Sequence, residues 1–264
     1  MMDNKILNNG NVKIYYTIKR GKKEALVFLH GEAGSLSAWK EILSFFERGD
    51  YTLIAVDLRG HGYSGRPESE EEYYFEKHVE DILSILKQEK ISEVILVGHC
   101  MGGMIGMMFA STYPLIVKKL ILINTGSKLP RMVGIFKPIL WMIVKLMEGV
   151  KFVKGGKRVD YAKYKNSHEL SLPRLYDDLI AMGVSSFAKQ CLACFRWNGE
   201  EYLKDISCPV LVIGATKDIL YPPSTTKRMA EVIPRHSIVF IESNHVSIIN
   251  VPRKIYDTMM EFLQ

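Results

Sequence analysis

The sequence predicts an α/β fold in which a mostly parallel β-sheet is flanked by helices. Short apolar runs rich in Val, Ile and Leu alternate with segments of helical periodicity, and these runs lack polar alternation, which indicates strands covered on both faces. Two alternating stretches on either side of Asn9-Gly10 open the chain and predict a hairpin. The alternation of strands and helices stops after Asn124 and resumes at Pro209, which indicates a helical insertion.

The core elements are expected in a regular order along the chain. Strands are predicted at residues 5–8, 12–19, 25–30, 52–57, 94–98, 119–124, 209–215 and 237–243. Helices are predicted at residues 38–48, 75–89, 101–113, 223–232 and 252–263. We therefore expect an eight-stranded core domain made of residues 1–125 and 208–264, and a helical cap made of residues 126–207 that is inserted after the sixth strand.

One segment of the cap, residues 132–153, is apolar enough to be compared with a membrane span. Lys137, Pro138, Lys145 and Glu148 interrupt it, whereas a span needs about 20 uninterrupted apolar residues. We therefore predict no transmembrane segment. The favoured interpretation is a lid helix that packs over a pocket, and an interfacial membrane helix is the alternative.

The composition excludes several classes of protein. The chain has 264 residues, 47% of them hydrophobic and 24% charged, which is typical of a folded protein with a buried core and not of a disordered, collagenous or coiled-coil chain. Four cysteines are too few for a disulfide scaffold, and the first residues do not run from a charged start into an apolar stretch. We therefore expect a cytoplasmic protein.

The formal net charge of +6 is concentrated in the cap. Between Lys128 and Lys165 the chain carries ten basic and two acidic residues, a net charge of +8, which leaves 25 basic and 27 acidic residues elsewhere. These cap charges either form a solvated helix face or attract an anionic acyl carrier or an anionic lipid surface. We expect no nucleic-acid partner.

The most informative motif is Gly98-His99-Cys100-Met101-Gly102, which joins an apolar strand to a helix. A nucleophile on a sharp strand-to-helix turn needs small residues two positions away on either side, and Gly98 and Gly102 meet this need. The helix N-terminus favours an anion, so it stabilises a thiolate and later an oxyanion. We therefore interpret Cys100 as a nucleophile rather than as a packing cysteine.

Together with two further motifs, this turn resembles the α/β-hydrolase superfamily over nearly the whole chain. The turn is similar to the family's GxSxG elbow with Cys in place of Ser. The segment from His30 to Gly34 is similar to the HGxxG oxyanion loop, and the segment from Asp57 to Ser64 is similar to the DxRGxGxS turn. The resemblance implies the α/β-hydrolase fold and an activity like that of an esterase or a thioesterase.

The resemblance also implies roles for individual residues. In this family the nucleophile, the acid and the base follow one another along the chain, and here Cys100 is followed by Asp218 and His245. Both later residues come directly after apolar strands, where open α/β sheets place their ligands. The family's oxyanion positions correspond to the backbone N–H groups of Glu32 and Met101.

Other polar and aromatic residues compete for places in this site. Asn124 stands at the end of the sixth strand, where some relatives carry their acid, so the acid is assigned to Asp218. His30 and His99 lie within the motifs, and together with Trp141 of the cap they are possible pocket residues.

Two patterns that suggest other chemistry are rejected. Cys191 and Cys194 form a CxxC, but no second ligand pair follows and their spacing places both on one packed face of a helix, so we predict no metal site. The segment from Gly60 to Gly65 fits GxGxxG, but Pro67 and an acidic run follow it instead of a helix. We therefore predict an enzyme without a cofactor.

The expected reaction is acyl transfer from a small-molecule substrate through a covalent acyl-Cys100 intermediate. A thiolate leaves readily, so thioesters, lactones and activated esters suit it better than alkyl esters. An acyltransferase, a slow-turnover binding or signalling protein on the same fold, and a serine enzyme whose nucleophile has been replaced by Cys are the alternatives. Glu32 is unusual beside an oxyanion site. It either points to solvent or faces the pocket.

Overall fold

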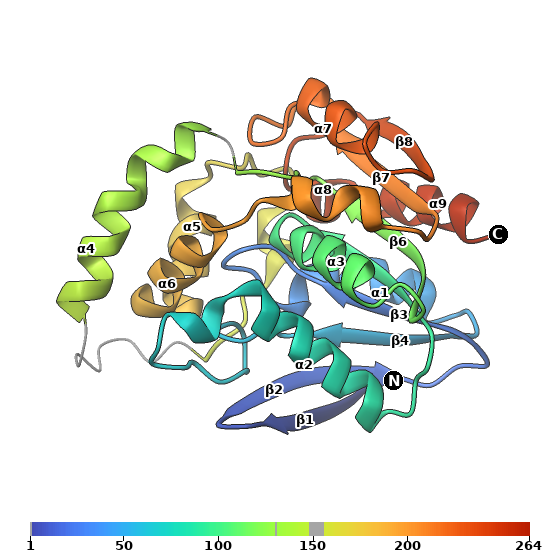
Figure 1. Cartoon of the computed structure of the whole chain (residues 1–264), viewed down its shortest axis with the longest axis horizontal. Coiled ribbons are helices and arrows are strands. Elements are labelled where there is room, and N and C mark those ends of the chain that lie inside the picture. Colours follow the sequence, from blue (N-terminus) through green and yellow to red (C-terminus); the bar gives the residue numbers. More distant parts are fainter. Residues whose placement is uncertain (1, 130, 148–155) are drawn as a thin grey trace.

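The computed structural model describes residues 2–129, 131–147 and 156–264 and shows a central sheet between layers of helices (Figure 1). The sheet has eight strands in the order β1-β2-β4-β3-β5-β6-β7-β8. The strands are β1 (Asp3–Asn9), β2 (Val12–Lys19), β3 (Lys23–Leu29), β4 (Tyr51–Val56), β5 (Val94–His99), β6 (Val117–Ile123), β7 (Val210–Ala215) and β8 (His236–Ile241). β1 and β2 pair antiparallel, as do β2 and β4, and all other neighbouring strands are parallel. The predicted eight-stranded, mostly parallel sheet is confirmed.

The helices lie on both faces of this sheet. They are α1 (Lys40–Phe46), α2 (Phe75–Gln88), α3 (Met101–Thr112), α4 (Lys137–Met147), α5 (Leu172–Met182), α6 (Val184–Cys194), α7 (Pro223–Ala230), α8 (Ser247–Asn250) and α9 (Pro252–Leu263). α2, α3 and α7 share one hydrophobic cluster with the sheet, whereas α1 and α9 share the other. The first predicted helix differs, because residues 36–39 form a 3-10 turn, whose first N–H donates to the Asp57 carboxylate, and α1 begins at Lys40.

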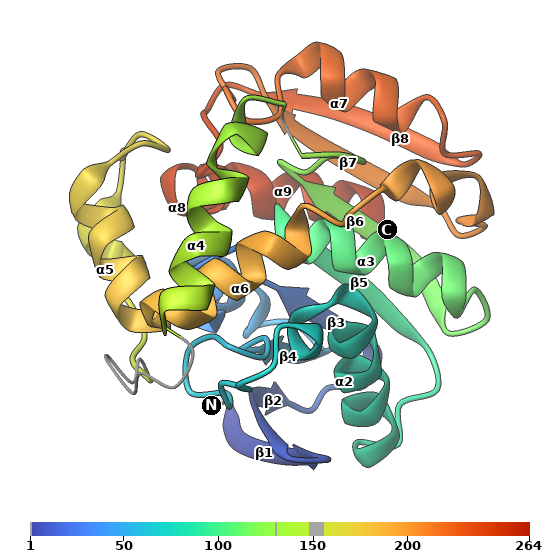
Figure 2. The same ribbon diagram turned by 60° about the vertical axis from the view of Figure 1, so that its left-hand side comes forward.

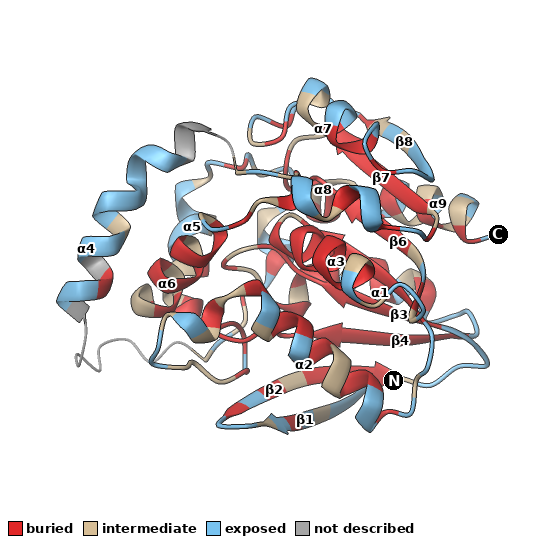
Figure 3. Cartoon of the chain, in the orientation of Figure 1, coloured by how far each residue is buried: buried red, intermediate tan, exposed pale blue. Residues whose placement is uncertain are grey.

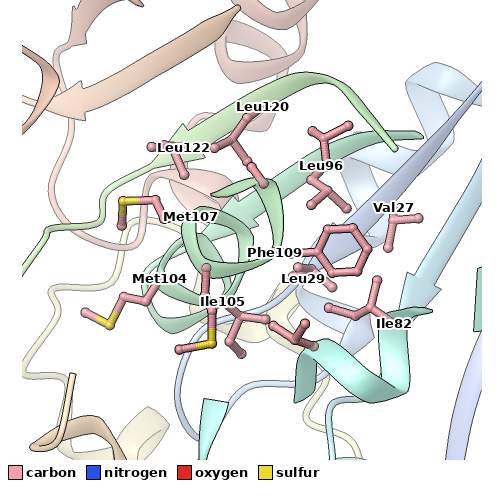
Figure 4. Packing of buried hydrophobic residues seen from close by; sticks show 14 of the residues in the cluster. Val27, Leu29, Ile82, Leu96, Met104, Ile105, Met107, Phe109, Leu120 and Leu122 are labelled. Carbon is pink, nitrogen blue, oxygen red and sulfur yellow. The ribbon is translucent and has the colours of Figure 1, made fainter. Parts of the chain in front are cut away.

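The two-sided burial of the central strands explains their unbroken apolar sequences. In β3, Val27 and Leu29 face the cluster that contains α3, while Leu26 and Phe28 face the opposite cluster. Figure 4 shows Val27 and Leu29 packed with residues of β5, β6 and α3. Because successive side chains of a strand point to opposite faces, a strand with helices on both sides has no polar face to display.

The opening hairpin forms as predicted. β1 pairs with β2 from Asp3 opposite Ile18 to Asn9 opposite Val12, and the turn between them contains Gly10 at a φ of 59°. Glycine adopts this left-handed conformation without a steric penalty, so the Asn-Gly pair in the sequence marks the turn.

The insertion between β6 and β7 contains α4, α5 and α6, and its described residues include no strand. α4 lies across α6, as Figure 2 shows, and Val144 of α4 packs against Ala188 and Leu192. Within residues 132–153, a helix is observed from Lys137 to Met147, and residues 148–153 lie outside the described residues. The role of this helix as a lid stays a prediction. The division of the chain into a core domain and a cap domain stays a prediction. Among the described helices, none combines the length and the apolar character needed to cross a membrane.

Candidate active site

Cys100 occupies a strained turn between β5 and α3. Its φ of 51° and ψ of −118° lie outside the regions that non-glycine residues usually adopt. The glycines on either side make the turn possible, because a Cβ on Gly98 would lie 2.4 Å from the carbonyl oxygen of Gly102, and a Cβ on Gly102 would lie 2.2 Å from that of Leu29. The backbone N–H of Cys100 donates to the carbonyl of Ile123 on β6 at 3.0 Å, which holds the turn at the carboxyl end of the sheet.

Asp218 and His245 meet at the same edge of the sheet, following β7 and β8. The imidazole Nδ1 of His245 lies 3.0 Å from Oδ2 of Asp218. The other carboxylate oxygen, Oδ1, accepts hydrogen bonds from the backbone N–H groups of Leu220 and Tyr221, each at 2.9 Å. Burial opposes ionisation of Asp218, but the hydrogen bond and charge of His245 and these N–H donors outweigh it, so the pKa of Asp218 is lowered.

Asn124, at the end of β6, supports this pair. Its side-chain Nδ2 donates to Oδ2 of Asp218 at 2.9 Å, and its Oδ1 accepts a hydrogen bond from the hydroxyl of Ser247. Asn124 therefore stabilises the ionised carboxylate of Asp218, a role that the sequence analysis did not foresee.

The side chain of Cys100 interacts with the ring of His245. Burial alone would lower the pKa of His245, but the negative charge of the Cys100 thiolate, the hydrogen bonds with Asp218 and Cys100 and the Asp218 charge raise it to about 10. The imidazole is therefore protonated at neutral pH. His99 lies beneath this ring, and its Nε2 donates to the carbonyl of His245 at 2.9 Å. Burial and the charge of His245 lower the pKa of His99 to about 3, so His99 stays neutral.

The loop after β3 runs along the other side of Cys100. A Cβ on Gly31 would lie 3.1 Å from the Cβ of Cys100, so glycine permits this close approach. The backbone N–H of Leu58 donates to Nε2 of His30 at 3.0 Å, which leaves Nδ1 of His30 to donate to the carbonyl of Gly31 at 2.8 Å. Met101 is the first residue of α3, so its N–H has no partner within the helix.

A cavity of about 350 Å³ opens above Cys100, between the sheet edge and the insertion. Its floor includes His99, Cys100, Met101, Tyr221 and His245. Its walls are mainly apolar and come from the insertion: Leu129, Leu140, Leu170, Leu175, Phe187 and Phe195.

The possible pocket residues have different positions. His99 lines the cavity, whereas His30 and Trp141 do not. His30 is fully buried below the loop after β3, where its ring donates to and accepts from the backbone. Trp141 is 55% exposed, because the inner face of α4 is occupied by Leu140 and Val144 instead.

A family model described as the alpha/beta hydrolase fold matches residues 24–252. The chain belongs to this family. Protein ABHD8 of Homo sapiens is 31% identical over 247 residues, which are 90% of this chain and 54% of that protein, so this chain spans about half the length of that relative. The 3-oxoadipate enol-lactonase 2 of Acinetobacter baylyi is 23% identical, and the match covers 90% of this chain and 88% of that enzyme. The crystal structure of an enol-lactonase from Burkholderia xenovorans has a TM-score of 0.79 at 20% identity, covering 98% of this chain and 99% of that one. The structural likeness establishes the hydrolase fold.

Glu32 is a further polar side chain that this member of the alpha/beta hydrolase fold family places beside Cys100. It faces the cavity, with Oε1 4.0 Å from Sγ of Cys191 and Oε2 3.8 Å from Sγ of Cys194. Burial and the charge of Cys100 raise the pKa of Glu32 well above its usual range. Of the two orientations left open by the sequence, the inward one is observed, and its surroundings favour the neutral form of the carboxyl group.

Cys191 and Cys194 do lie on one face of α6, as their spacing predicts, but this face lines the cavity. Burial and the charge of Glu32 raise the pKa of both thiols well above the usual range. They are therefore protonated and able to donate to Glu32. Within the described part of the chain, no group of three or more His, Cys, Asp and Glu side chains is placed to hold a metal ion.

Three charged residues of the insertion also line the cavity: Glu169 and Asp178, which are buried, and Arg174, which is partly buried. No motif in the sequence singles them out. Nη1 of Arg174 lies 2.7 Å from Oδ2 of Asp178, and Nη2 donates to the backbone carbonyl of Glu169 at 2.6 Å. Burial outweighs this ion pair at Asp178 and raises its pKa to about 6. The wall that the insertion contributes therefore combines this charged group with apolar side chains.

Proposed function

We propose that this chain hydrolyses thioesters, lactones or activated carboxylic esters through a covalent acyl intermediate on Cys100, with His245 as proton carrier and Asp218 as its orienting acid. The observation that carries the proposal is the meeting of these three residues, which are far apart in the sequence. Cys100 is held on a strained turn at a helix N-terminus, and the His245 ring in contact with it is fixed by a 3.0 Å hydrogen bond to Asp218.

In the first half of the proposed reaction, the Cys100 thiolate attacks the acyl carbonyl carbon, and the carbonyl electrons move to oxygen. The backbone N–H groups of Met101 and Glu32 stabilise this oxyanion, since both residues border the cavity beside Cys100. When the oxyanion collapses, the bond to the leaving group breaks, and His245 donates its proton to the departing oxygen or sulfur. The acyl group is then a thioester on Cys100.

The second half follows from the charge coupling at His245. Acylation removes the negative charge of Cys100, which is the largest effect raising the pKa of His245. The pKa therefore falls, and the neutral imidazole accepts a proton from a water molecule that attacks the thioester. Once the new C–O bond has formed, the C–S bond breaks and the Cys100 thiolate leaves. Its charge returns His245 to the protonated form.

The cavity and the nucleophile together favour certain substrates. The walls from the insertion are mainly apolar, which suits a hydrocarbon acyl chain. A thiolate is expelled from the tetrahedral intermediate more easily than an alkoxide, so an alkyl ester tends to return to substrate. We therefore expect thioesters, enol esters and lactones to react faster than alkyl esters of the same acyl chain.

The test is an acyl-donor panel of short and long esters, thioesters and lactones with the wild-type chain and with Cys100→Ala. Intact mass and product release are recorded together, and Cys208→Ala, which removes a cysteine outside the cavity, is the matched control. We expect an acyl adduct on the wild type and on Cys208→Ala that clears during turnover, and no adduct on Cys100→Ala.

Two other outcomes have distinct meanings. Failure of every donor to acylate Cys100 would contradict the proposal and favour a binding or signalling role on the same fold. Transfer of the acyl group to an added amine in preference to water would identify an acyltransferase that uses the same intermediate.

A further inference from the structure

The insertion displays most of the large exposed apolar side chains of the described chain. Sixteen large hydrophobic residues are exposed, and ten of them belong to the insertion. Six of the ten lie on or directly before α4 and four lie on or beside α5: Ile135, Phe136, Ile139, Trp141, Met142 and Leu146, then Leu170, Leu172, Leu175 and Tyr176. We call these ten residues the outer apolar surface. Figure 3 shows α4 largely exposed at one side of the molecule.

The outer apolar surface is not the edge of a core that α4 already completes. The inner face of α4 is occupied, because Leu140 and Val144 pack against Ala188, Leu192 and Phe195 of the α6 segment. The outward residues Ile139, Met142 and Leu146 follow the same helical spacing on another face of α4. A helix that is apolar on two faces is usually buried on both, so the second face predicts a partner.

The charge of the insertion indicates what kind of partner fits. The segment from Lys128 to Lys165 carries ten basic and two acidic residues, and Lys137 and Lys145 lie on α4 itself, among the apolar side chains. A second copy of the chain would bring the same positive charge against this surface and be repelled. An anionic lipid surface offers both an apolar layer and complementary charge.

The same surface adjoins the entrance of the cavity above Cys100. Leu170 and Leu175 belong to the outer apolar surface and also line the cavity, and Leu140, on the inner face of α4, lines it from another side. An apolar chain that leaves a lipid layer at this surface therefore reaches the cavity along apolar side chains.

We propose that the outer apolar surface docks in the interfacial layer of an anionic lipid bilayer, with α4 lying in the plane of the membrane. The 11 described residues of α4 are too few to cross a bilayer, whereas an interfacial helix needs only one buried face. It follows, and this part rests on the proposed function, that acyl chains held in the membrane are the substrates that the cavity receives.

Tryptophan fluorescence of the unlabelled chain can report whether the outer apolar surface docks on a membrane. Of its three tryptophans, Trp39 and Trp197 are buried and Trp141 is 55% exposed on the outer apolar surface. Vesicles of equal parts phosphatidylcholine and phosphatidylglycerol are added to the wild-type chain, and tryptophan emission is recorded. We expect a blue shift and quenching by lipids brominated on the acyl chain. Both changes should be absent in Trp141→Phe, which should still sediment with the vesicles.

Variants locate the contact on the protein. Ile139→Ser combined with Leu146→Ser removes two large side chains that do not line the cavity, and we expect vesicle partitioning to weaken by about tenfold or more. Leu115→Ser, at a 92% exposed leucine outside the insertion, is the matched control and should bind like the wild type. Binding to pure phosphatidylcholine should be much weaker, and binding to the anionic vesicles should decrease as salt increases.

Several results would overturn the proposal. One is that anionic vesicles leave the tryptophan emission unchanged. A second is that the Ile139/Leu146 double variant partitions onto vesicles as well as the wild type does. A third is that the wild type dimerises without lipid and the double variant does not. Failure of the proposed function is a separate result, because vesicle binding by Cys100→Ala should equal that of the wild type. The Ile139/Leu146 double variant should also cleave a water-soluble short-chain thioester at the wild-type rate.

Discussion

Cys100 and His245 control each other's charge, and this coupling decides when His245 acts as an acid and when it acts as a base. The thiolate raises the pKa of His245 against the effect of burial, and acylation or removal of the thiol ends that stabilisation. A histidine without such a neighbour, at the same depth, would be neutral, as His99 is.

Replacing Cys100 with Ala should therefore lower the pKa of His245 from about 10 by at least about one unit, because the charge that raises it most is lost while burial remains. The measurement is an NMR titration of the histidine ring resonances. Cys208→Ala should leave the His245 titration unchanged. An unaltered titration in Cys100→Ala would mean that the thiol and the ring do not form an ion pair.

Glu32 should help the reaction only in its neutral form. Because burial and the charge of Cys100 raise its pKa, Glu32→Gln should retain kcat/KM within a few-fold at neutral pH. At the alkaline pH where Glu32 ionises, a carboxylate beside the developing oxyanion repels it, so the wild type should fall about tenfold below the variant. The measurement is the pH profile of kcat/KM. The control variant Glu24→Gln, at an exposed site on β3, should have the pH profile of the wild type. If kcat/KM of the wild type and of Glu32→Gln decreased equally at alkaline pH, Glu32 would have no part in the reaction.

The residues that the sequence could identify are those whose local surroundings carry a pattern. Cys100 has glycines at fixed offsets, and Asp218 and His245 directly follow apolar strands. The contact between Glu32 and Cys194 joins residues 162 positions apart, and no local pattern predicts that they meet. The CxxC spacing correctly places Cys191 and Cys194 on one face, but only the packing of α6 shows what that face meets.

At the scale of elements, the turn before α3 leaves little space for any side chain larger than that of glycine at Gly98 and Gly102. The helix begins directly after Cys100, and its first turn lies against the end of β3, where Gly102 meets the backbone of Leu29. One turn later, at Gly106, an added Cβ would meet only the Cδ1 of Leu120, at 3.1 Å, and this side chain can move.

Gly102→Ala should therefore lower the free energy of unfolding by about 3 kcal/mol and displace Cys100, with loss of activity. Gly106→Ala, in the same helix, should change stability by less than about 1 kcal/mol, because the small contact is offset by the better helix propensity of Ala. Urea unfolding of both variants provides the comparison. Equal stabilities would show that the first turn of α3 can move away from β3.

The elements that were predicted well are those with one dominant signal. The unbroken apolar runs predict buried parallel strands, and the Asn-Gly turn predicts the hairpin, because burial on two faces and a positive φ each require few residue types. The insertion was predicted only as helical. The path of α4 across α6 depends on Val144 meeting Ala188 and Leu192, which are more than 40 positions away along the chain.

At the scale of the whole molecule, the uneven distribution of charge along the chain produces the interactions of longest range. The insertion segment from Lys128 to Lys165 carries +8 and the rest of the chain −2, so the positive charge is concentrated in one stretch of the sequence. Some of these basic residues, such as Lys151 and Lys154, lie outside the described residues.

An acyl group attached to an anionic carrier, such as a phosphopantetheine thioester, should therefore react more slowly as salt increases. We expect kcat/KM to fall several-fold between about 0.01 M and about 0.15 M ionic strength, over which the screening length decreases from about 30 Å to about 8 Å. A neutral thioester of the same acyl chain should change little. Initial rates on both substrates test this, and equal salt effects would exclude charge attraction as the cause.

The four cysteines also give the protein a practical property. Burial raises the pKa of Cys191 and Cys194 well above the usual range and that of Cys208 to about 11, whereas Cys100 adjoins the protonated ring of His245. Burial therefore suppresses the reactivity of the other three cysteines toward an alkylating reagent, while the sulfur of Cys100 lies on the floor of the cavity beside an imidazolium. We expect a fluorophore or an affinity handle to attach selectively at Cys100, with every native cysteine left in place.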